Sequence, residues 1–263
     1  MDIKNKIVWL TGASSGIGEA LCYELNEAGA KLIISSRNSE MLYQVKLKCT
    51  KKPMDIHVLP LDLEKTDTLP EIAESALRIY GSIDMIIHSG GVSQRSLALE
   101  TGLDVAQKIM NINFWGTVAL SKAVLPSMID KGAGHLVIIS SLVGKFGTKF
   151  RSAYAASKHA LHGYFDSLRT EIDPNIKISI ICPGFIKTNV TINALTSDGS
   201  KQNTMDNAQA NGMPARDCAK KIIKAIESNK QEVYIGGKER YSVLLKRFFP
   251  TVFSKLIRKA KVT

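Results

Sequence analysis

Tyr154 and Lys158 are the residues of this chain whose types and spacing most clearly allow chemistry. They stand four positions apart in the stretch Tyr154-Ala155-Ala156-Ser157-Lys158. On a helix, that spacing places both side chains on one face, with their Cβ atoms about 5–6 Å apart. Because a neighbouring ammonium stabilises a phenolate, we expect Lys158 to lower the pKa of Tyr154 from its usual value of about 10. The pair is therefore a candidate acid–base device.

Two further features make this pair specific, since similar pairs also occur on ordinary solvated helices. Ser141 lies thirteen residues before Tyr154, at the end of an apolar, strand-like run. The chain also opens with a glycine-rich turn, Gly12-x-x-x-Gly16-x-Gly18, between an expected strand and an expected helix. Together these features predict that a nicotinamide cofactor and an acid–base catalyst share one site.

The glycine-rich turn has the features of a phosphate cradle. Gly12 permits a tight turn, Gly16 lets the backbone approach a pyrophosphate, and Gly18 allows close packing of the helix on the sheet. The amide groups at the helix N-terminus then face the phosphates. The other candidate cofactor contacts in this turn are Ser14, Ser15 and Ile17.

Apolar runs alternate with amphipathic segments along the chain, which predicts an α/β fold with a doubly wound parallel sheet and helices on both faces. The seven expected strands are Ile7–Thr11, Lys31–Ser35, Ile56–Leu61, Ile83–His88, Gly134–Ser140, Lys177–Ile181 and Glu232–Ile235. The expected helices span 17–29, 39–50, 66–80, 103–130, 152–172 and 214–228. We expect one domain over 1–237, with 238–263 as a basic amphipathic extension of it. The polar segment 189–213 is expected to be disordered or to act as a lid.

The composition fits an ordinary globular protein and excludes several classes. Of the 263 residues, 44% are hydrophobic and 22% are charged. No apolar run reaches the ~18 residues that a spanning helix needs. The first residues lead directly into a strand, so we expect no signal peptide and a cytoplasmic protein. The four cysteines are scattered without metal-ligand spacing, so no metal site is expected.

The net charge of +11 is concentrated at the C-terminus, because residues 238–263 contribute +7 of it. There, Phe and Leu residues alternate with basic ones, and Pro250 divides the segment into two short helical pieces. This pattern is typical of a peripheral membrane contact through 241–263. A segment that folds over the substrate cleft, or that forms a subunit contact, fits equally well. Nucleic-acid binding is less favoured because no recognition motif accompanies the charge.

The motif Thr-Gly-x-x-x-Gly-x-Gly, followed by Tyr-x-x-x-Lys, resembles the classical short-chain dehydrogenase/reductase family, over about residues 5–237. The resemblance implies a Rossmann-type fold and a catalytic set of four residues. Tyr154 would be the proton donor in reduction and the base in oxidation, and Lys158 would also hold the nicotinamide ribose. Ser141, rather than its neighbour Ser140, would hydrogen-bond the substrate oxygen. Asn113, rather than Asn111, would hold a water that connects Lys158 to solvent.

The second expected strand ends in Ser36 and Arg37, where NAD enzymes usually carry an acidic residue that binds the ribose 2′-hydroxyl. A guanidinium can instead pair with a 2′-phosphate. We therefore predict NADP(H) as the preferred cofactor, with NAD(H) possible. The alternative is that Arg37 is merely solvated or stacks on the adenine.

The resemblance implies further cofactor contacts after the later strands. They are Asp62 and Leu63 after the third, Ser89, Gly90 and Gly91 after the fourth, and Pro183, Gly184, Ile186 and Thr188 after the sixth. The family usually has Asn-Asn-Ala-Gly after the fourth strand, whereas this chain has His88-Ser89-Gly90-Gly91. We expect His88 to be a structural substitute that hydrogen-bonds the neighbouring strand.

The expected substrate wall is mostly apolar, which favours a hydrophobic ketone or secondary alcohol. Ser141 and Tyr154 would meet the reacting oxygen, and the wall itself would contain Leu142, Val143, Phe146, Phe150, Phe185 and the segment 189–213. The segment Ser93–Ser96 would contact substrate or shape the nearby loop. Two alternatives remain open: a 3-oxoacyl thioester reductase that docks an acidic acyl carrier, and a non-catalytic NADP(H)-binding scaffold. The resemblance also implies a homodimer or homotetramer, paired through helices 103–130 and 152–172.

Overall fold

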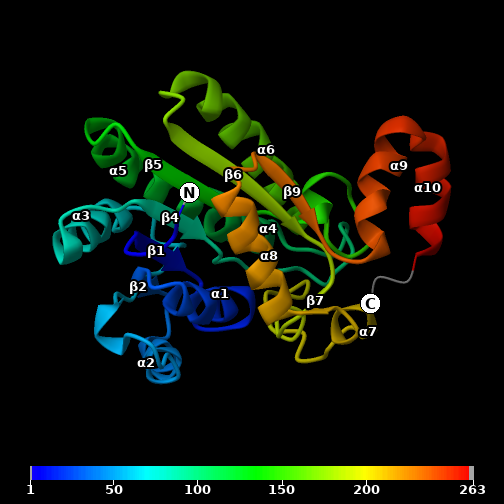
Figure 1. The fold of residues 1–263 in the computed structure, drawn as a ribbon. Coiled ribbons are helices and arrows are strands. Elements are labelled where there is room, and N and C mark those ends of the chain that lie inside the picture. The colour runs from blue at the N-terminus through cyan, green and yellow to red at the C-terminus, as the bar shows by residue number, and fades with distance from the viewer. Residues whose placement is uncertain (1, 261–263) are drawn as a thin grey trace.

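A computed structural model describes residues 2–260 and contains a seven-stranded sheet in which every neighbouring pair is parallel (Figure 1). Its strands are β1 (Ile7–Thr11), β2 (Lys31–Ser35), β3 (Ile56–Val58), β4 (Met85–His88), β5 (Gly134–Ile139), β6 (Ile176–Pro183) and β9 (Glu232–Ile235). Their order is β3-β2-β1-β4-β5-β6-β9. The order reverses between β1 and β4, and in such sheets ligands bind beyond the strand ends at this reversal. The predicted fold class is confirmed.

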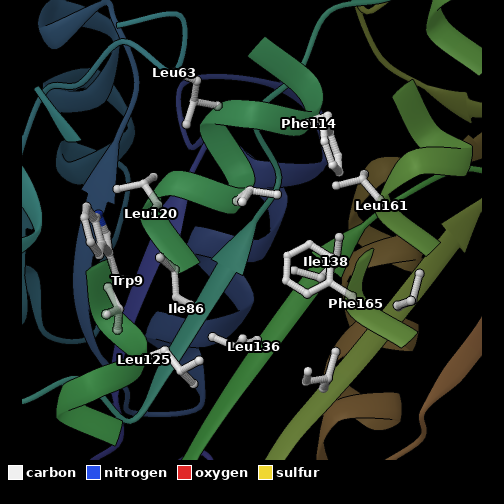
Figure 2. Packing of buried hydrophobic residues seen from close by; sticks show 14 of the residues in the cluster. Trp9, Leu63, Ile86, Phe114, Leu120, Leu125, Leu136, Ile138, Leu161 and Phe165 are labelled. Atoms are coloured by element: carbon white, nitrogen blue, oxygen red, sulfur yellow. The ribbon is translucent and has the colours of Figure 1, made fainter. Parts of the chain in front are cut away.

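Helices cover both faces of the sheet. One face packs against α1 (Gly16–Glu27), α2 (Ser39–Leu47) and α8 (Ala215–Glu227). The other packs against α3 (Leu69–Tyr80), α5 (Gly116–Asp130) and α6 (Ser152–Glu171). In the second layer, Trp9, Ile86 and Leu136 of the sheet meet Leu120 and Leu125 of α5 (Figure 2). This apolar burial on both faces explains why the strands read as continuous Ile, Val and Leu runs.

The expected helix 103–130 is not continuous. It consists of α4 (Leu103–Met110), a π-helical turn at Asn111–Trp115, and α5. At the start of α5 the chain passes close to the loop after β3, since a Cβ on Gly116 would lie 2.4 Å from the carbonyl oxygen of Leu63. The strand β3 is also shorter than expected. It ends at Val58, although the Leu59 and Leu61 amides still donate to the Ile34 and Ser36 carbonyls at 3.0 and 3.1 Å.

The segment 189–213 is folded against the loop that follows β4. Its ends are held by the short strands β7 (Ile186–Lys187) and β8 (Met213–Pro214), which pair in parallel. Leu195 forms a bridge with Gln94, in which the Arg95 amide donates to the Leu195 carbonyl at 2.8 Å. One short helix, α7 (Asn207–Ala210), completes the segment. Of the two expectations for this segment, an ordered cover over neighbouring loops fits the structure.

The basic tail forms a short turn at Lys238–Tyr241 and two helices, α9 (Ser242–Phe248) and α10 (Pro250–Lys259), which stand at one side of the sheet (Figure 1). Val243 and Phe253 are buried in the core. Phe248 and Phe249 are 66% and 60% exposed. The end of the predicted tail, residues 261–263, lies outside the described residues. Within 2–260, no helix has the length and apolar character needed to cross a bilayer.

Candidate active site

The predicted catalytic residues meet at the carboxyl edge of the sheet. Ser141 directly follows β5, and α6 carries Tyr154 and Lys158 past it. The Ser141 hydroxyl lies close enough to the Tyr154 phenol to act on its pKa, and it donates to the Pro183 carbonyl at 3.4 Å. The Lys158 ammonium lies 5.9 Å from the centre of the Tyr154 ring. The structure thus brings together three side chains that are separated by up to seventeen positions in the sequence.

The electrostatics of Tyr154 differ from the sequence-based expectation. Burial raises the pKa of Tyr154, while the Ser141 hydroxyl and the positive charges of Arg151 and Arg95 act in the opposite direction. Lys158 is not among the groups that lower the pKa of Tyr154. Its ammonium donates to the Ile139 carbonyl at 2.9 Å, and burial lowers the pKa of Lys158 to about 8. The positive charge around the phenol therefore comes chiefly from Arg95 and Arg151, neither of which was expected to act on Tyr154.

Ser141 and its neighbour Ser140 have different surroundings. Ser141 reaches Tyr154, and its oxygen also accepts a hydrogen bond from the Val143 amide at 3.3 Å. Ser140 instead donates to the Lys158 carbonyl at 3.3 Å and contacts His162 at 3.1 Å. The geometry thus favours Ser141 as the residue that would meet a substrate oxygen.

Asn113 lies in the π-helical turn and is fully buried. Its side-chain oxygen accepts from the Val92 amide at 2.8 Å. Its side-chain nitrogen donates to the Val92 carbonyl at 2.9 Å and to the Ser157 hydroxyl at 3.0 Å. A Cβ on Gly91 would lie 3.0 Å from the Asn113 oxygen and 3.7 Å from the Lys158 ammonium. Asn113 therefore braces the loop after β4 against the catalytic helix. The predicted water-holding role stays a prediction.

The glycine-rich turn has the close backbone approaches that a dinucleotide cradle needs. Gly12 has φ +67°, and a Cβ there would lie 2.6 Å from the Gly90 nitrogen. A Cβ on Gly18 would lie 2.1 Å from the Gly12 carbonyl oxygen. Ser15 precedes α1 without a side-chain cap, so the first amides of the helix stay available to an anion. The residues present fit a bound dinucleotide.

The adenosine end of this cradle is formed by residues after β2 and β3. The Leu61 amide donates to the Ser36 carbonyl at 3.1 Å, which puts Asp62 beside Arg37 at the same edge. Asp62 accepts from the Glu64 amide at 3.1 Å, as a turn residue does. Arg37 is exposed and, within the described part of the chain, forms no hydrogen bond or ion pair. Its guanidinium is thus available to a ligand.

The nicotinamide end is formed by the segment after β6. The Thr188 methyl group lies 3.1 Å from where a Cβ on Gly16 would be, so this segment meets the glycine-rich turn. The Gln209 amide donates to the Ile186 carbonyl. Glu239, in the tail, accepts from the Phe185 amide at 3.2 Å and from the Gly237 amide at 2.9 Å. Sequence reasoning missed Glu239, because a charged residue in a basic tail gives no signal of a buried contact.

His88 has a structural role, but its partner is not the expected one. Its Nε2 lies 2.9 Å from the Ser121 hydroxyl of α5, and not against a neighbouring strand. Burial lowers the pKa of His88 to about 3, so its ring is neutral at physiological pH. His88 therefore ties β4 to the helix layer.

A buried ion cluster beside the site was also missed. Both Nε and Nη2 of Arg95 donate to one oxygen of Asp206, at 2.8 and 2.6 Å, and Arg151 approaches the same oxygen at 3.4 Å. The side chain of Arg95 is only 5% exposed, that of Asp206 3% and that of Arg151 7%. Two guanidiniums on one carboxylate leave one net positive charge near Tyr154. No local motif reveals it, since Asp206 lies 111 positions from Arg95.

The expected substrate wall is partly assembled. Val143 is buried, and Phe150 and Phe185 are half-buried near Tyr154 and the segment 189–213. Phe150 has φ +66°, a strained backbone conformation for a bulky residue. Phe146 does not fit the prediction, because it packs edge-on against Phe253 of α10, with ring centres 5.2 Å apart. Among residues 2–260, no three His, Cys, Asp or Glu side chains gather as a metal site would require.

Comparison with known proteins adds independent support for the fold. A family model described as short chain dehydrogenase matches residues 6–198. "Dehydrogenase/reductase SDR family member 7B" of Danio rerio is 38% identical, over 97% of this chain and 85% of its own length. A short-chain dehydrogenase/reductase of Burkholderia phymatum, solved with NAD, has a TM-score of 0.84 at 18% identity and covers 100% of this chain and 98% of its own. One from Burkholderia cenocepacia, solved with NADP, has a TM-score of 0.81 at 19% identity, over 98% and 99%.

Proposed function

Because the chain belongs to the short-chain dehydrogenase/reductase family, we propose that it is an NADP(H)-dependent oxidoreductase that acts on a hydrophobic carbonyl or secondary alcohol. The observation that carries the proposal is the convergence of Ser141, Tyr154 and Lys158 at the end of the glycine cradle, with the Lys158 ammonium 5.9 Å from the centre of the Tyr154 ring. The apolar side chains of Val143, Phe150 and Phe185 support the choice of a hydrophobic substrate.

In the proposed reaction, the bound nicotinamide supplies a hydride to the carbonyl carbon, or accepts one from the alcohol carbon. Tyr154 gives its phenolic proton to the oxygen that becomes the alcohol, and in oxidation it takes that proton back. The Ser141 hydroxyl donates a hydrogen bond to the same oxygen, where negative charge develops. Arg151 and Arg95 stabilise the tyrosinate that is left. The catalysis thus depends on a phenol that is buried but surrounded by positive charge.

The preference for NADP(H) rests on Arg37. Its guanidinium is exposed and unpaired within residues 2–260, beside the turn that contains Asp62. A bidentate guanidinium–phosphate pair would favour a 2′-phosphate over a hydroxyl. The two solved neighbours were obtained with NAD in one case and NADP in the other, so the fold accepts either. The choice is therefore made by side chains at this edge.

Replacing Arg37 by Asp is expected to reverse the cofactor preference. Losing a charged hydrogen-bonding pair costs about 1.5–3 kcal/mol, which corresponds to a roughly 10–150-fold weaker binding of NADPH. The affinity for NADH should rise or stay the same, because a carboxylate can accept from the 2′-hydroxyl. Fluorescence titration with both cofactors measures this. Arg78→Asp, on the exposed face of α3, is the matched control, and an unchanged NADPH/NADH ratio in Arg37→Asp would refute the assignment.

The activity itself is tested by NADPH oxidation with a panel of ketones, aldehydes and acetoacetyl thioesters. Turnover of a hydrophobic ketone supports the proposal and identifies the substrate class. Preferred turnover of the thioesters would support the acyl-thioester reductase instead. Tight NADPH binding without turnover of any carbonyl would support the non-catalytic scaffold.

We further propose that the cytoplasmic protein contacts membrane surfaces through α9 and α10. The exposed Leu244, Phe248, Phe249, Val252 and Leu256 are flanked by basic residues, a pattern that favours anionic lipid. Replacing Phe248 and Phe249 together by Ser should reduce sedimentation with anionic liposomes at low salt at least about tenfold. Met54→Ser, which removes an even more exposed apolar side chain elsewhere, should leave it unchanged. Failure of the unmodified protein to sediment would end this proposal.

A homodimer or homotetramer is also proposed, paired through the outer faces of α5 and α6. This contact would cover the half-exposed Trp115 and Ile129, which lie at the two ends of α5. Light scattering on the intact protein decides the point, and a monomer would contradict it.

A further inference from the structure

Gln94 is fully buried in the loop between β4 and α4, and each polar atom of its side chain has a partner. Its Oε1 accepts from the Ala153 amide at 2.8 Å and from the Tyr154 amide at 3.2 Å. Its Nε2 lies within hydrogen-bonding distance of the hydroxyls of Thr101, Ser96 and Ser152, at 2.8, 3.2 and 3.2 Å. A neutral amide thus connects the loop directly to the backbone of the catalytic tyrosine.

These contacts supply a cap that α6 lacks. The helix begins at Ser152, and Arg151 before it provides no side-chain cap. The first amides of a helix have no partner within it, and burying them unpaired is costly. Gln94 satisfies two of them from outside the helix. Its backbone also pairs with Leu195, so the same residue joins the first turn of α6 to the segment 189–213.

It matters that this cap is an amide and not a carboxylate, because the side chain of Tyr154 lies beside it. Helix N-termini favour carboxylates, so a glutamate could cap α6 at least as strongly. The groups that face the Tyr154 side chain are Ser141 after β5, Lys158 on α6, Arg151 just before α6, and Arg95 from the loop, with Asp206 behind the arginines. A carboxylate at position 94 would place a second negative charge among them. An amide provides the same acceptor without that charge.

We propose that Gln94 is a positioning residue for the reaction, a neutral external cap that fixes the first turn of α6, and so Tyr154, without placing a negative charge beside the phenol. The inference rests on the proposed role of Tyr154 as the proton donor. The structure contributes the rest: complete burial, two accepted amide hydrogen bonds, and a donor group held by three hydroxyls.

Gln94→Glu tests the charge, because it keeps the size and the capping oxygen. Of the three hydroxyls around the second oxygen, that of Ser152 can rotate to donate to it, whereas Thr101 already donates to the Leu97 carbonyl at 2.8 Å. A nearby negative charge disfavours the phenolate, so the pKa of Tyr154 should rise by about one unit. We would follow the phenol by NMR of protein labelled at the tyrosine ζ-carbon, with Tyr154→Phe to assign the resonance. The rate of alcohol oxidation, which needs the phenolate, should rise at a pH about one unit higher than in the unmodified protein.

Leu99→Glu is the charge control, because Leu99 lies in the same loop but is fully exposed. It should leave the titration of Tyr154 unchanged. Gln94→Leu tests the cap without a charge: kcat should fall at least about tenfold, and amide hydrogen exchange at Ala153 and Tyr154 should become faster.

The outcomes distinguish a failure of the role of Gln94 from a failure of the proposed function. An unchanged Tyr154 titration in Gln94→Glu, or a Gln94→Leu variant with normal kcat and normal exchange, would overturn the role of Gln94. If the unmodified protein reduced no carbonyl, the proposed function would fail. The titration and exchange measurements need no turnover, and they would still show whether Gln94 holds the first turn of α6 as proposed.

Discussion

Tyr154→Phe is expected to lower kcat for carbonyl reduction by about 10²–10⁴-fold. The substitution removes the phenolic proton that the developing alkoxide needs, and it removes the partner of Ser141. The ring itself stays, so its packing in the core is preserved. NADPH affinity should change little, because the glycine cradle after β1 does not involve the hydroxyl. The measurement is NADPH oxidation under saturating carbonyl, with cofactor affinity obtained separately by fluorescence.

Tyr164→Phe is the matched control for this result. Tyr164 lies on the same helix, but its ring packs against Phe114 and Phe165, away from Ser141. We expect near-normal kcat in this variant. A Tyr154→Phe enzyme that kept most of its activity, or an equal loss in both variants, would show that the hydroxyl of Tyr154 is not the proton donor.

Asp206→Asn is expected to destabilise the protein by about 3–5 kcal/mol. The substitution keeps the shape of the side chain but removes the carboxylate that Arg95 and Arg151 share. Two buried guanidiniums would then lose this shared negative charge. Urea unfolding at neutral pH measures the free energy of unfolding directly.

Asp198→Asn is the control in the same segment. Asp198 is exposed and accepts hydrogen bonds from Thr196 and Ser200, each of which lies two positions away in the sequence. Its loss should leave the free energy of unfolding nearly unchanged. If both variants were equally stable, the ion cluster would contribute little to the stability of the protein.

Local sequence patterns predicted the parts of the molecule that depend on local physics. The strands were readable because a parallel sheet covered on both faces needs runs of Ile, Val and Leu. The glycine turn and the Tyr154–Lys158 pair were readable because a strand-to-helix turn and an i, i+4 spacing are fixed by neighbours along the chain. These elements place the edge of the sheet at which the site lies.

Long-range contacts were not predictable in the same way. The partnership of Arg95 with Asp206, and the Glu239 contact to Phe185, join residues 111 and 54 positions apart with no shared motif. The environment of Tyr154 was also misjudged, because the spacing to Lys158 said nothing of burial or of the Ile139 carbonyl that holds the ammonium. A polar residue in a loop gives no local sequence signal that the fold will bury it.

Because of the π-helical turn at Asn111–Trp115, α4 before it and α5 after it pack against different parts of the protein. An α-helix advances about 100° per residue, so one additional residue in a turn rotates everything beyond it by that angle. Val105 and Ile109 before the turn pack toward Leu195, whereas Leu120 and Val124 after it pack into the layer against the sheet. Chain length in this turn is therefore under tight constraint. Deleting a single residue there would restore a regular helix, but it would put one half out of phase with its neighbours and carry Asn113 away from the loop it braces.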